Sequence, residues 1–183
     1  MIRFGFALAL VVAALAACGD PVRIRAQFET VADTVTVFAL TGTPVIAPAA
    51  LSTVRHEAVR IETTRDFDIV VDIDDAGRAV FYPVQLVGGS PGNTGIQTTT
   101  ESFDAILEAP RTGYVRDAAT TLAVGDVVII EAEPAFCRAS LQPAIYSKLV
   151  VDEIDLATRS VRVRIVVDPN CGFRSLAEGI PER

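Results

Sequence analysis

The sequence is poor in several residue types that often mark a functional class. It has no tryptophan, a single histidine and three cysteines among 183 residues. The absence of tryptophan weakens the case for a sugar-binding surface built on exposed flat rings. Asp and Glu outnumber Lys and Arg by 23 to 16, and no block of basic residues occurs. Because nucleic-acid binding depends on basic patches, no nucleic-acid partner is expected.

The sequence gives little support for the common catalytic sites. The letters G-x-S-x-G occur once, at residues 88–92, but within a glycine-rich stretch that we interpret as a flexible connection rather than a nucleophile elbow. Gly88–Gly95 also lacks the Gly-Lys-Ser/Thr ending of a phosphate-binding loop. His56 has no nucleophile or metal-ligating partner at a useful spacing. We therefore expect a non-enzymatic protein without a metal or cofactor. A hydrolase that uses paired carboxylates is an alternative, because acidic residues are plentiful and their pairing is invisible in a sequence.

Asp72–Gly77 resembles the start of a calcium-binding EF-hand loop, because it combines a D-x-D pattern with a glycine. Later ligand positions hold Ala76 and, where a bidentate glutamate belongs, Pro83. The sequence therefore predicts a solvated acidic hairpin turn, with weak calcium binding as the alternative.

The start of the chain is an apolar segment that follows a minimal positive region at Arg3. Phe4–Ala17 is an uninterrupted run of apolar and small residues. As a helix, these fourteen residues would span about 21 Å, which is less than the ~30 Å hydrocarbon core of a bilayer. Residues 1–17 are therefore predicted to be a signal peptide rather than a membrane-spanning helix.

The end of this segment, Leu15-Ala16-Ala17-Cys18, resembles the lipobox of bacterial lipoproteins. The resemblance implies that Cys18 is the first mature residue and carries acyl chains such as palmitate, and that 18–21 is a lipidated tether. Several acyl chains on one residue suffice for stable membrane anchoring. It also implies a place in the bacterial cell envelope. Asp20 falls one position later than the inner-membrane retention signal known in some bacteria, and this favours the outer membrane. Ordinary secretion after cleavage at Ala14-Leu15-Ala16 is the alternative.

Two cysteines remain if Cys18 is lipidated, and an even remainder in an oxidising compartment predicts one disulfide. Three strands of an up-down-up meander are expected, at Asp126–Ala132, Ser147–Ile154 and Val161–Val167. Because the first and third strands run the same way, the loops after them lie at one end of the sheet. Cys137 follows the first strand and Cys171 the third, so these two residues are predicted to pair. No C-x-x-C occurs and the histidine is remote, so a zinc site lacks ligands.

Alternation of apolar and polar residues, the period of a half-buried strand, recurs earlier in the chain. It predicts strands at Val22–Glu29, Val35–Leu40 and Val59–Glu62, with a turn at Ala32–Thr34. A hairpin is expected with Phe67, Ile69, Val71 and Ile73 on one face, a turn at Asp74–Gly77 and a return strand at Arg78–Val87. Pro83 cannot donate to a strand ladder, which predicts an edge or a bulge there.

One short helix is predicted after the glycine-rich Gly88–Gly95, because Phe103, Ile106 and Leu107 have helical spacing before Pro110. The fold expected for residues 22–183 is all-β: an antiparallel β-sandwich, or a barrel-like sandwich, of roughly nine strands. The alternative is a pair of sub-modules, 22–87 and 102–183, joined by the Gly/Thr-rich stretch 88–101.

Four stretches, "TGYVRD", "VGDVVII", "IYSKLVVDEID" and "VVDPNCGFRSL", resemble the C-terminal half of uncharacterised bacterial lipoproteins with no assigned activity. The resemblance covers Thr112–Leu176, and it implies a self-contained β module with the Cys137–Cys171 pair. We expect a lipid-anchored binding or structural module that contacts the membrane through Cys18 and an envelope protein or glycan elsewhere. A carrier or chaperone with an apolar cavity is the first alternative to this expectation.

Overall fold

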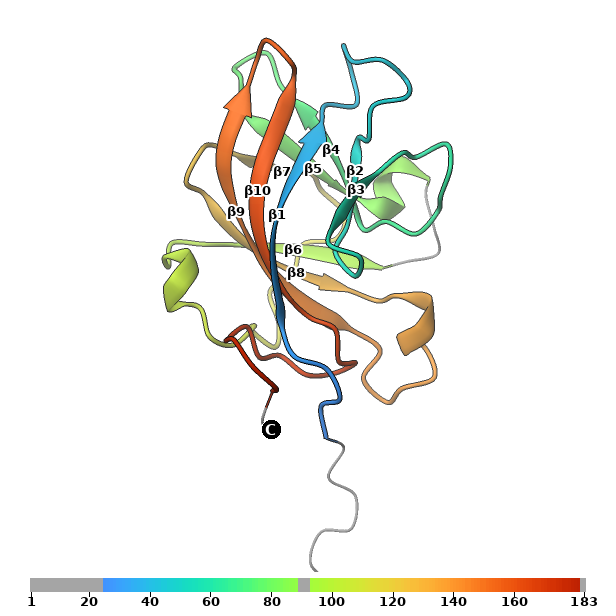
Figure 1. Cartoon of the computed structure of the whole chain (residues 1–183), viewed down its shortest axis with the longest axis vertical. Coiled ribbons are helices and arrows are strands. Elements are labelled where there is room, and N and C mark those ends of the chain that lie inside the picture. The colour runs from blue at the N-terminus through green and yellow to red at the C-terminus, as the bar shows by residue number, and fades with distance from the viewer. Residues whose placement is uncertain (1–24, 89–92, 182–183) are drawn as a thin grey trace, which may run out of the picture.

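The computed structural model describes residues 25–88 and 93–181, which form an antiparallel β-sandwich of two five-stranded sheets (Figure 1). The all-β prediction is confirmed. The predicted signal peptide at 1–17, Cys18 and the tether 18–21 lie outside the described residues. No helix in the described ranges has the length and apolar character needed to cross a bilayer.

Sheet A contains the N-terminal strand and most of the C-terminal half of the chain. In spatial order its strands are β1 (Val31–Phe38), β10 (Ser160–Asp168), β9 (Ile145–Asp155), β8 (Val127–Ala132) and β6 (Thr94–Thr99). Sheet B contains β3 (Glu57–Val59), β2 (Ala50–Ser52), β4 (Ile69–Ile73), β5 (Ala79–Pro83) and β7 (Thr120–Leu122). The two halves of the chain thus exchange strands, because β1 pairs with β10 and β7 pairs with β5.

The predicted meander is β8, β9 and β10, and the pairing confirms its up-down-up order. Along β10, Val163 and Ile165 point into the core, while Arg162 and Arg164 point out of the sandwich. β8 is buried on both faces, as its unbroken apolar run predicts. The predicted hairpin is β4 and β5 with its turn at Asp74–Gly77.

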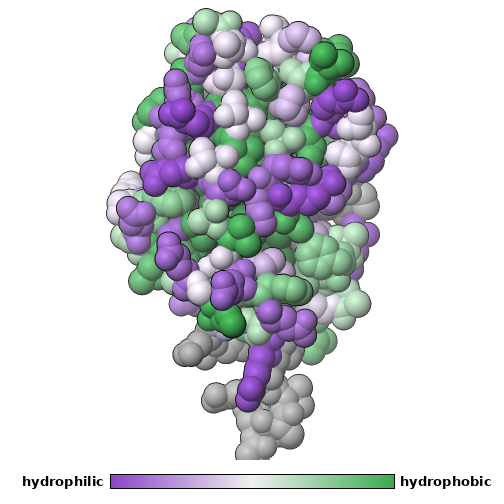
Figure 2. Space-filling view, viewed as in Figure 1, coloured by the Kyte–Doolittle hydropathy of each residue, from purple (hydrophilic) through white to green (hydrophobic). Residues whose placement is uncertain are grey.

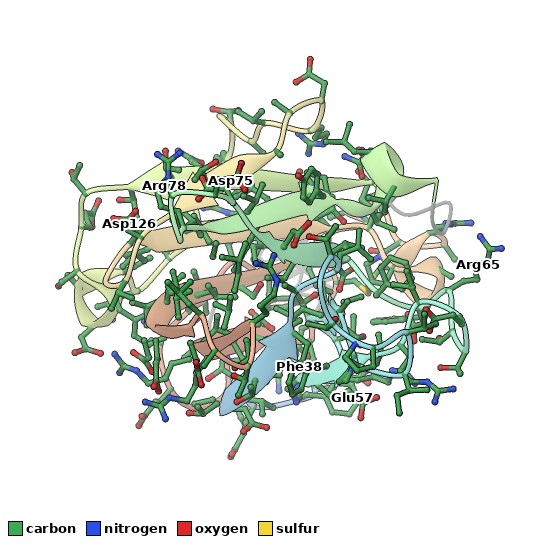
Figure 3. The ribbon with its side chains drawn as sticks, turned by 90° about the horizontal axis from the view of Figure 1, so that it is seen from above. Phe38, Glu57, Arg65, Asp75, Arg78 and Asp126 are labelled. Atoms are coloured by element: carbon green, nitrogen blue, oxygen red, sulfur yellow. A yellow bond between two sulfur atoms is a disulfide. The ribbon has the colours of Figure 1, made fainter. Side chains whose placement is uncertain are left out.

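The core lies between the two sheets and is filled by aliphatic side chains and one ring. Its largest fully buried members include Leu51, Ile69, Phe81, Ile130, Leu149 and Ile165. Seen from above, Phe38 of sheet A lies beside Glu57 of sheet B, and Asp75 and Arg78 of the β4–β5 hairpin lie on the opposite side of the view (Figure 3). Pro83 ends β5 beyond the part of the strand that pairs with β7, so its missing N–H leaves no gap in that ladder.

The described residues of Val22–Glu29 do not form the predicted strand, because the side chain of Asn170 forms hydrogen bonds with their backbone groups. The Oδ1 atom of Asn170 accepts hydrogen bonds from the N–H groups of Gln27 (2.8 Å) and Phe28 (3.0 Å). The Nδ2 atom of Asn170 donates to Phe28 O at 2.8 Å and to Oδ1 of Asp168 at 2.7 Å. We call this arrangement the Asn170 clamp. It fixes where the N-terminal segment joins the sandwich, at the lower end in Figure 1.

The turn predicted at Ala32–Thr34 is also wrong, because β1 pairs with β10 without interruption from Val31 to Phe38. The short helix predicted before Pro110 is reduced to one turn of 3-10 helix, Phe103–Ala105. The helix is short because the ammonium of Lys148, on β9, binds the carbonyl groups of Phe103 and Ile106. Those carbonyls would accept backbone bonds in a continued α-helix.

Candidate functional site

The outer face of sheet A is crossed by two segments that we call the straps, residues 103–109 and 172–178. They pair with each other through Ala109 N to Arg174 O (2.8 Å) and Leu176 N to Leu107 O (2.9 Å). A second apolar cluster holds them on the sheet, and it includes Ile106, Ala109, Val127, Ile129, Tyr146 and Leu176. The straps leave hollows on both sides.

Lys148 fixes the first strap to the sheet. Its side chain projects from the outer face of β9, and its Nζ atom donates to Phe103 O at 2.9 Å and Ile106 O at 2.8 Å. The residue is 4% exposed, and burial lowers the pKa of its ammonium, while Asp104 and Glu178 oppose that change. Two carbonyl partners therefore compensate a buried cation.

A hollow of about 490 Å³, the lysine hollow, opens beside this contact, between the straps and β1. Phe103 forms part of its wall, with the Lys148 ammonium 4.7 Å and the Arg164 guanidinium 5.0 Å from the ring centre. Arg164 is also paired with Asp152 at 3.0 Å. Both cations are thus engaged by groups of this chain, and the lysine hollow serves as the anchor of the strap.

The opposite side of the straps carries two adjoining hollows of about 340 and 580 Å³, which we call the arginine cleft. The two hollows share Arg111, Gln142 and Arg174. The remaining side chains that matter for its chemistry are Glu108, Glu131, Glu133, Leu141 and Tyr146. On the face shown in Figure 2, hydrophilic and hydrophobic residues are interspersed, as on an ordinary protein surface. The arginine cleft is distinguished by convergent charges rather than by an apolar patch.

Glu131 provides the buried acid of this cleft. It lies near the end of β8, is 8% exposed, and forms an ion pair with Arg116. Burial raises the pKa of Tyr146, and a hydrogen bond with Glu131 raises it further. The phenol therefore stays protonated at neutral pH and serves Glu131 as a donor. A buried carboxylate with two partners is a fixed recognition group rather than a mobile one.

The partners of Glu131 are positioned by a close backbone approach at Gly95 of β6. The segment that carries Arg116 pairs with β6 through Val115 N to Ile96 O (3.0 Å) and Ile96 N to Val115 O (2.9 Å). A β-carbon at Gly95 would lie 2.6 Å from the β-carbon of Tyr114, so only glycine leaves room for this pairing. The ring of Tyr114 then packs 6.1 Å from that of Tyr146.

Arg174 is the second fixed cation of the cleft. It forms an ion pair with Glu108 and donates to the carbonyl of Ala109. Since Glu108 and Ala109 belong to one strap and Arg174 to the other, the side-chain contacts repeat the backbone pairing. The straps are thereby joined at the rim of the cleft.

The walls of the cleft are covalently joined by the disulfide that the sequence predicts. Cys137 and Cys171 are bonded, with Cα atoms 5.6 Å apart and a separation of 34 positions in the sequence. Cys137 ends η3 (Ala135–Cys137), in the loop that leads to Gln142, and Cys171 directly precedes the second strap. The disulfide therefore holds together the two segments that carry Gln142 and Arg174.

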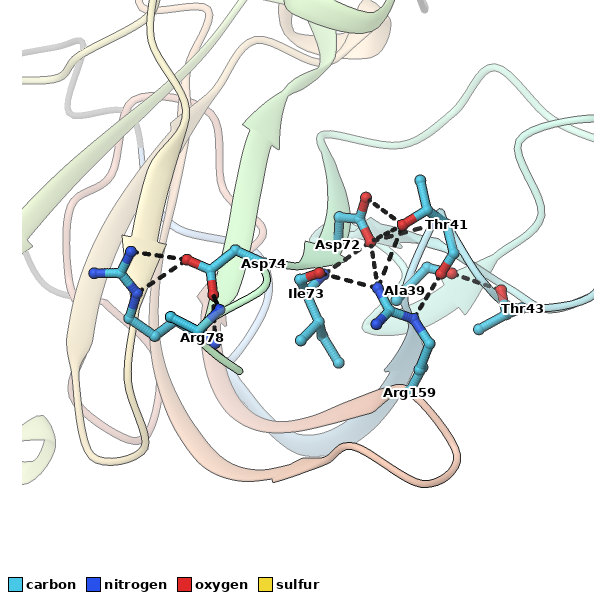
Figure 4. A network of polar contacts seen from close by, with 9 residues as sticks. Ala39, Thr41, Thr43, Asp72, Ile73, Asp74, Arg78 and Arg159 are labelled. Carbon is cyan, nitrogen blue, oxygen red and sulfur yellow. Dashed lines mark hydrogen bonds and ion pairs between the residues drawn. The ribbon is translucent and has the colours of Figure 1, made fainter.

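The acidic turn at Asp72–Gly77 binds groups of its own chain (Figure 4). Asp74 accepts the N–H groups of Ala76 (3.0 Å) and Arg78 (2.9 Å), and it pairs with the Arg78 guanidinium at 2.8 Å. Asp72 accepts the hydroxyl of Thr41 at 2.9 Å and pairs with Arg159 at 3.3 Å. The hydrogen-bonding capacity of these carboxylates serves the turn, as the hairpin interpretation predicts.

His56 lies in the turn between β2 and β3 with a left-handed backbone, φ 51°. Burial lowers its pKa, and the charge of Asp33 opposes that change. Its Nε2 atom is buried and has no hydrogen-bond partner among the residues that the structure describes. Within those residues, no group of three or more His, Cys, Asp or Glu side chains is placed to hold a metal ion.

The arginine cleft was not predicted from the sequence. Two signals of buried polar contacts were available: Glu131 follows the apolar run Val127–Ile130 of β8, and Lys148, the only lysine in the chain, sits among the apolar residues of β9. Charged residues are seldom buried without partners, so each indicates a polar contact on the outer face of the sheet, Glu131 at the arginine cleft and Lys148 at the lysine hollow. Their partners Arg116 and Ile106 lie in loops that no periodic pattern places.

The fold and cleft define a β-sandwich with a polar, disulfide-walled cleft on one outer face. No family model matches the chain, and neither a curated protein nor a solved structure matches it. The geometry of the cleft therefore carries the functional argument.

Proposed function

We propose that the protein is a lipid-anchored binding module of the bacterial cell envelope, and that the arginine cleft binds its ligand. One observation carries the proposal: the polar groups on the floor of the cleft are held in place before any ligand arrives. Glu131 is fixed by Arg116 and Tyr146, and Arg174 is fixed by Glu108. Such preorganisation reduces the entropy lost on binding.

A binding role is favoured over hydrolysis by paired carboxylates, the alternative left open by the sequence. Glu131 and Glu133 line the same hollow, as a carboxylate pair requires. However, the carboxylate of Glu131 is already engaged by a guanidinium and a phenol, and Glu133 accepts the amide of Asn93 at 3.1 Å. Neither group is arranged as a proton donor toward a substrate.

A binding role is also favoured over the carrier with an apolar cavity. The hollows described above open on the outer surface, whereas the space between the sheets is filled by the main core cluster. An apolar passenger would need a sheltered apolar volume. The arginine cleft instead offers charged and amide groups.

The membrane anchor is the part of the proposal that rests on Leu15-Ala16-Ala17-Cys18. Metabolically supplied labelled fatty acid should enter the protein, and Cys18→Ser should abolish both the label and sedimentation with membranes. Cys18→Ser should also abolish the cellular role. If the Cys18→Ser variant still sediments with membranes, or fully rescues a deletion strain as a soluble protein, the anchor proposal is wrong.

The cleft is tested with a photoreactive phenylalanine analogue introduced at one of two exposed leucines. Leu141, at the cleft, is 96% exposed, and Leu156, in the distant β9–β10 turn, is 60% exposed. In native membranes we expect a specific envelope adduct from position 141 that is absent from position 156. The adduct should disappear when Arg174→Met removes the fixed cation. Identical adducts from both positions, or no adduct at 141, would overturn the proposed site.

A further inference from the structure

Two opposite charges in the arginine cleft have no ion-pair partner within the described part of the chain. Arg111 lines both hollows, and its side chain forms no ion pair or hydrogen bond with the described residues. The carboxylate of Glu133 lines one of these hollows and binds only the uncharged amide of Asn93 there. The two charges face one hollow of about 340 Å³ without pairing with each other. Each is therefore open to a ligand group of opposite charge.

Gln142 and Leu141 add neutral groups to the same surface. Gly172, with φ 79°, packs so closely that its added β-carbon would lie 2.5 Å from the β-carbon of Gln142. Gly172 N also donates to Ala144 O at 2.8 Å, so the Gln142 backbone is held against the second strap. The side-chain amide of Gln142 makes no hydrogen bond within the described residues, and Leu141 is almost fully exposed. The cleft thus presents a cation, an anion, an amide and an aliphatic side chain.

We propose that the arginine cleft binds a zwitterionic amino acid or short peptide, with its carboxylate on Arg111 and its ammonium on Glu133. This inference rests on the proposed function, and it names the ligand class. A guanidinium binds a carboxylate through two parallel hydrogen bonds, which gives orientation as well as affinity. The Gln142 amide is placed to bind a peptide group, and Leu141 to contact an aliphatic side chain.

The charge balance of the cleft separates a zwitterion from a simple anion or cation. The pairs Arg116–Glu131 and Arg174–Glu108 are internally compensated, whereas Arg111 and Glu133 line the cleft without an ion pair to any described residue. A ligand with only a carboxylate would leave Glu133 without a partner, and a ligand with only an ammonium would leave Arg111 without one. A ligand that carries both charges satisfies both groups, and this is how a site discriminates among similar ligands.

The test uses trialanine in three forms: with free ends, with an acetylated amine and with an amidated carboxylate. Binding to the mature Cys18→Ser protein is followed by isothermal titration and by NMR shifts of backbone amides. We expect either cap to weaken binding about tenfold or more, because each removes one charge-assisted contact. Arg111→Gln should bind the free and amidated forms equally, and Glu133→Gln should bind the free and acetylated forms equally. Arg60→Gln and Glu62→Gln, which change exposed charges outside the cleft, are the matched controls.

Two results overturn the inference: equal binding of all three forms, and no binding of any form at millimolar concentration. Neither result decides the proposed function, which the crosslink at position 141 tests separately. If that adduct forms and depends on Arg174 while trialanine fails to bind, the cleft is a site for another ligand class. Loss of both the adduct and peptide binding overturns the two proposals together. Binding of a peptide attached to an envelope polymer, rather than a free peptide, is distinguished by the mass of the adduct.

Discussion

The ammonium of Lys148 lies 2.8 Å from the carbonyl oxygen of Ile106, 42 positions earlier in the chain. This contact joins the middle of sheet A to the first strap. Since that strap separates the lysine hollow from the arginine cleft, one side chain helps to shape both. The contact also explains why the helical spacing at 103–107 does not produce a helix.

Replacement of Lys148 by methionine should loosen the strap. Lys148→Met keeps the length of the stem but leaves the carbonyls of Phe103 and Ile106 without their donor, at a cost of about 1–2 kcal/mol in the free energy of unfolding. Hydrogen exchange should accelerate at the amides of Ala109 and Leu176, which hold the straps together. Arg162→Met, which removes only an exposed pair with Glu153, is the control. Equal exchange in the two variants would contradict the assigned role of Lys148.

The disulfide should support both stability and binding. Replacement of Cys137 and Cys171 by alanine should lower the free energy of unfolding by about 3–4 kcal/mol, the chain-entropy value for a loop of this length. Urea unfolding measures this loss. In the protein that keeps both cysteines, thiol alkylation after unfolding without reduction should label neither Cys137 nor Cys171. Trialanine binding should weaken even where the double variant is fully folded, because the walls of the cleft are no longer joined. Unchanged binding in the folded variant would show that the cleft forms without the disulfide.

Asp68 should make stability depend on pH. Burial raises its pKa above the ordinary value of 3.8, and the hydrogen bonds from Thr53 only partly oppose this. As the pH rises from 3.8 to the raised pKa, the unfolded chain loses its proton while the folded chain keeps it. Stability therefore falls through that window and stays lower above it. Asp68→Asn should make this fall smaller, as urea unfolding from acidic to neutral pH will measure, and Asp168, whose pKa burial also raises, accounts for a fall that remains.

A second variant checks the cause of the Asp68 effect. The hydroxyl of Thr53 donates to Asp68 at 2.5 Å, so Thr53→Val removes a contact that favours the ionised carboxylate. The pH range over which stability falls should then reach to higher pH than in the unchanged protein. A window that moves downward in Thr53→Val would contradict the assignment to Asp68.

Two variants of Arg159 should separate the stabilisation that its side-chain contacts provide from the destabilisation that its left-handed backbone causes. Its φ is 51°, which disfavours any residue with a β-carbon, while its guanidinium binds Asp72 and the carbonyls of Thr41 (2.8 Å) and Ile73 (2.9 Å) (Figure 4). Arg159→Gly and Arg159→Ala both lose these contacts, but only glycine relieves the backbone. We expect the Gly variant to be more stable than the Ala variant by about 1 kcal/mol in thermal and urea unfolding. Equal stability would show that the backbone there costs nothing.

The meander could be predicted because its strands are long and separated by clear turn signals. The alternation in β10 and the unbroken apolar run of β8 report burial on one face and on two faces, respectively. The same alternation failed at Gln27 and Phe28, because their backbone groups bind the side chain of Asn170, more than 140 positions away. Local periodicity holds no information about a partner so distant.

The arginine cleft was harder to predict for the same reason. Glu131 and Tyr146 lie on neighbouring strands, yet Arg116, Arg111 and Arg174 come from loops and straps without a regular period. The predicted pair of Cys137 and Cys171 was the nearest approach to the cleft, because it connects the same two segments. It identified a covalent link but not the side chains around it.

The Asn170 clamp also limits how far the cleft can lie from an anchor on Cys18. Nine peptide steps lead from Cys18 to Gln27, and a fully extended chain spans at most ~3.5 Å per residue, or about 30 Å in all. Asn170 itself stands two residues before Gly172, where the wall of the cleft begins. On a lipid-anchored protein, the binding site would thus sample only a thin layer above the bilayer, and a ligand more distant from the membrane would have to be brought to it.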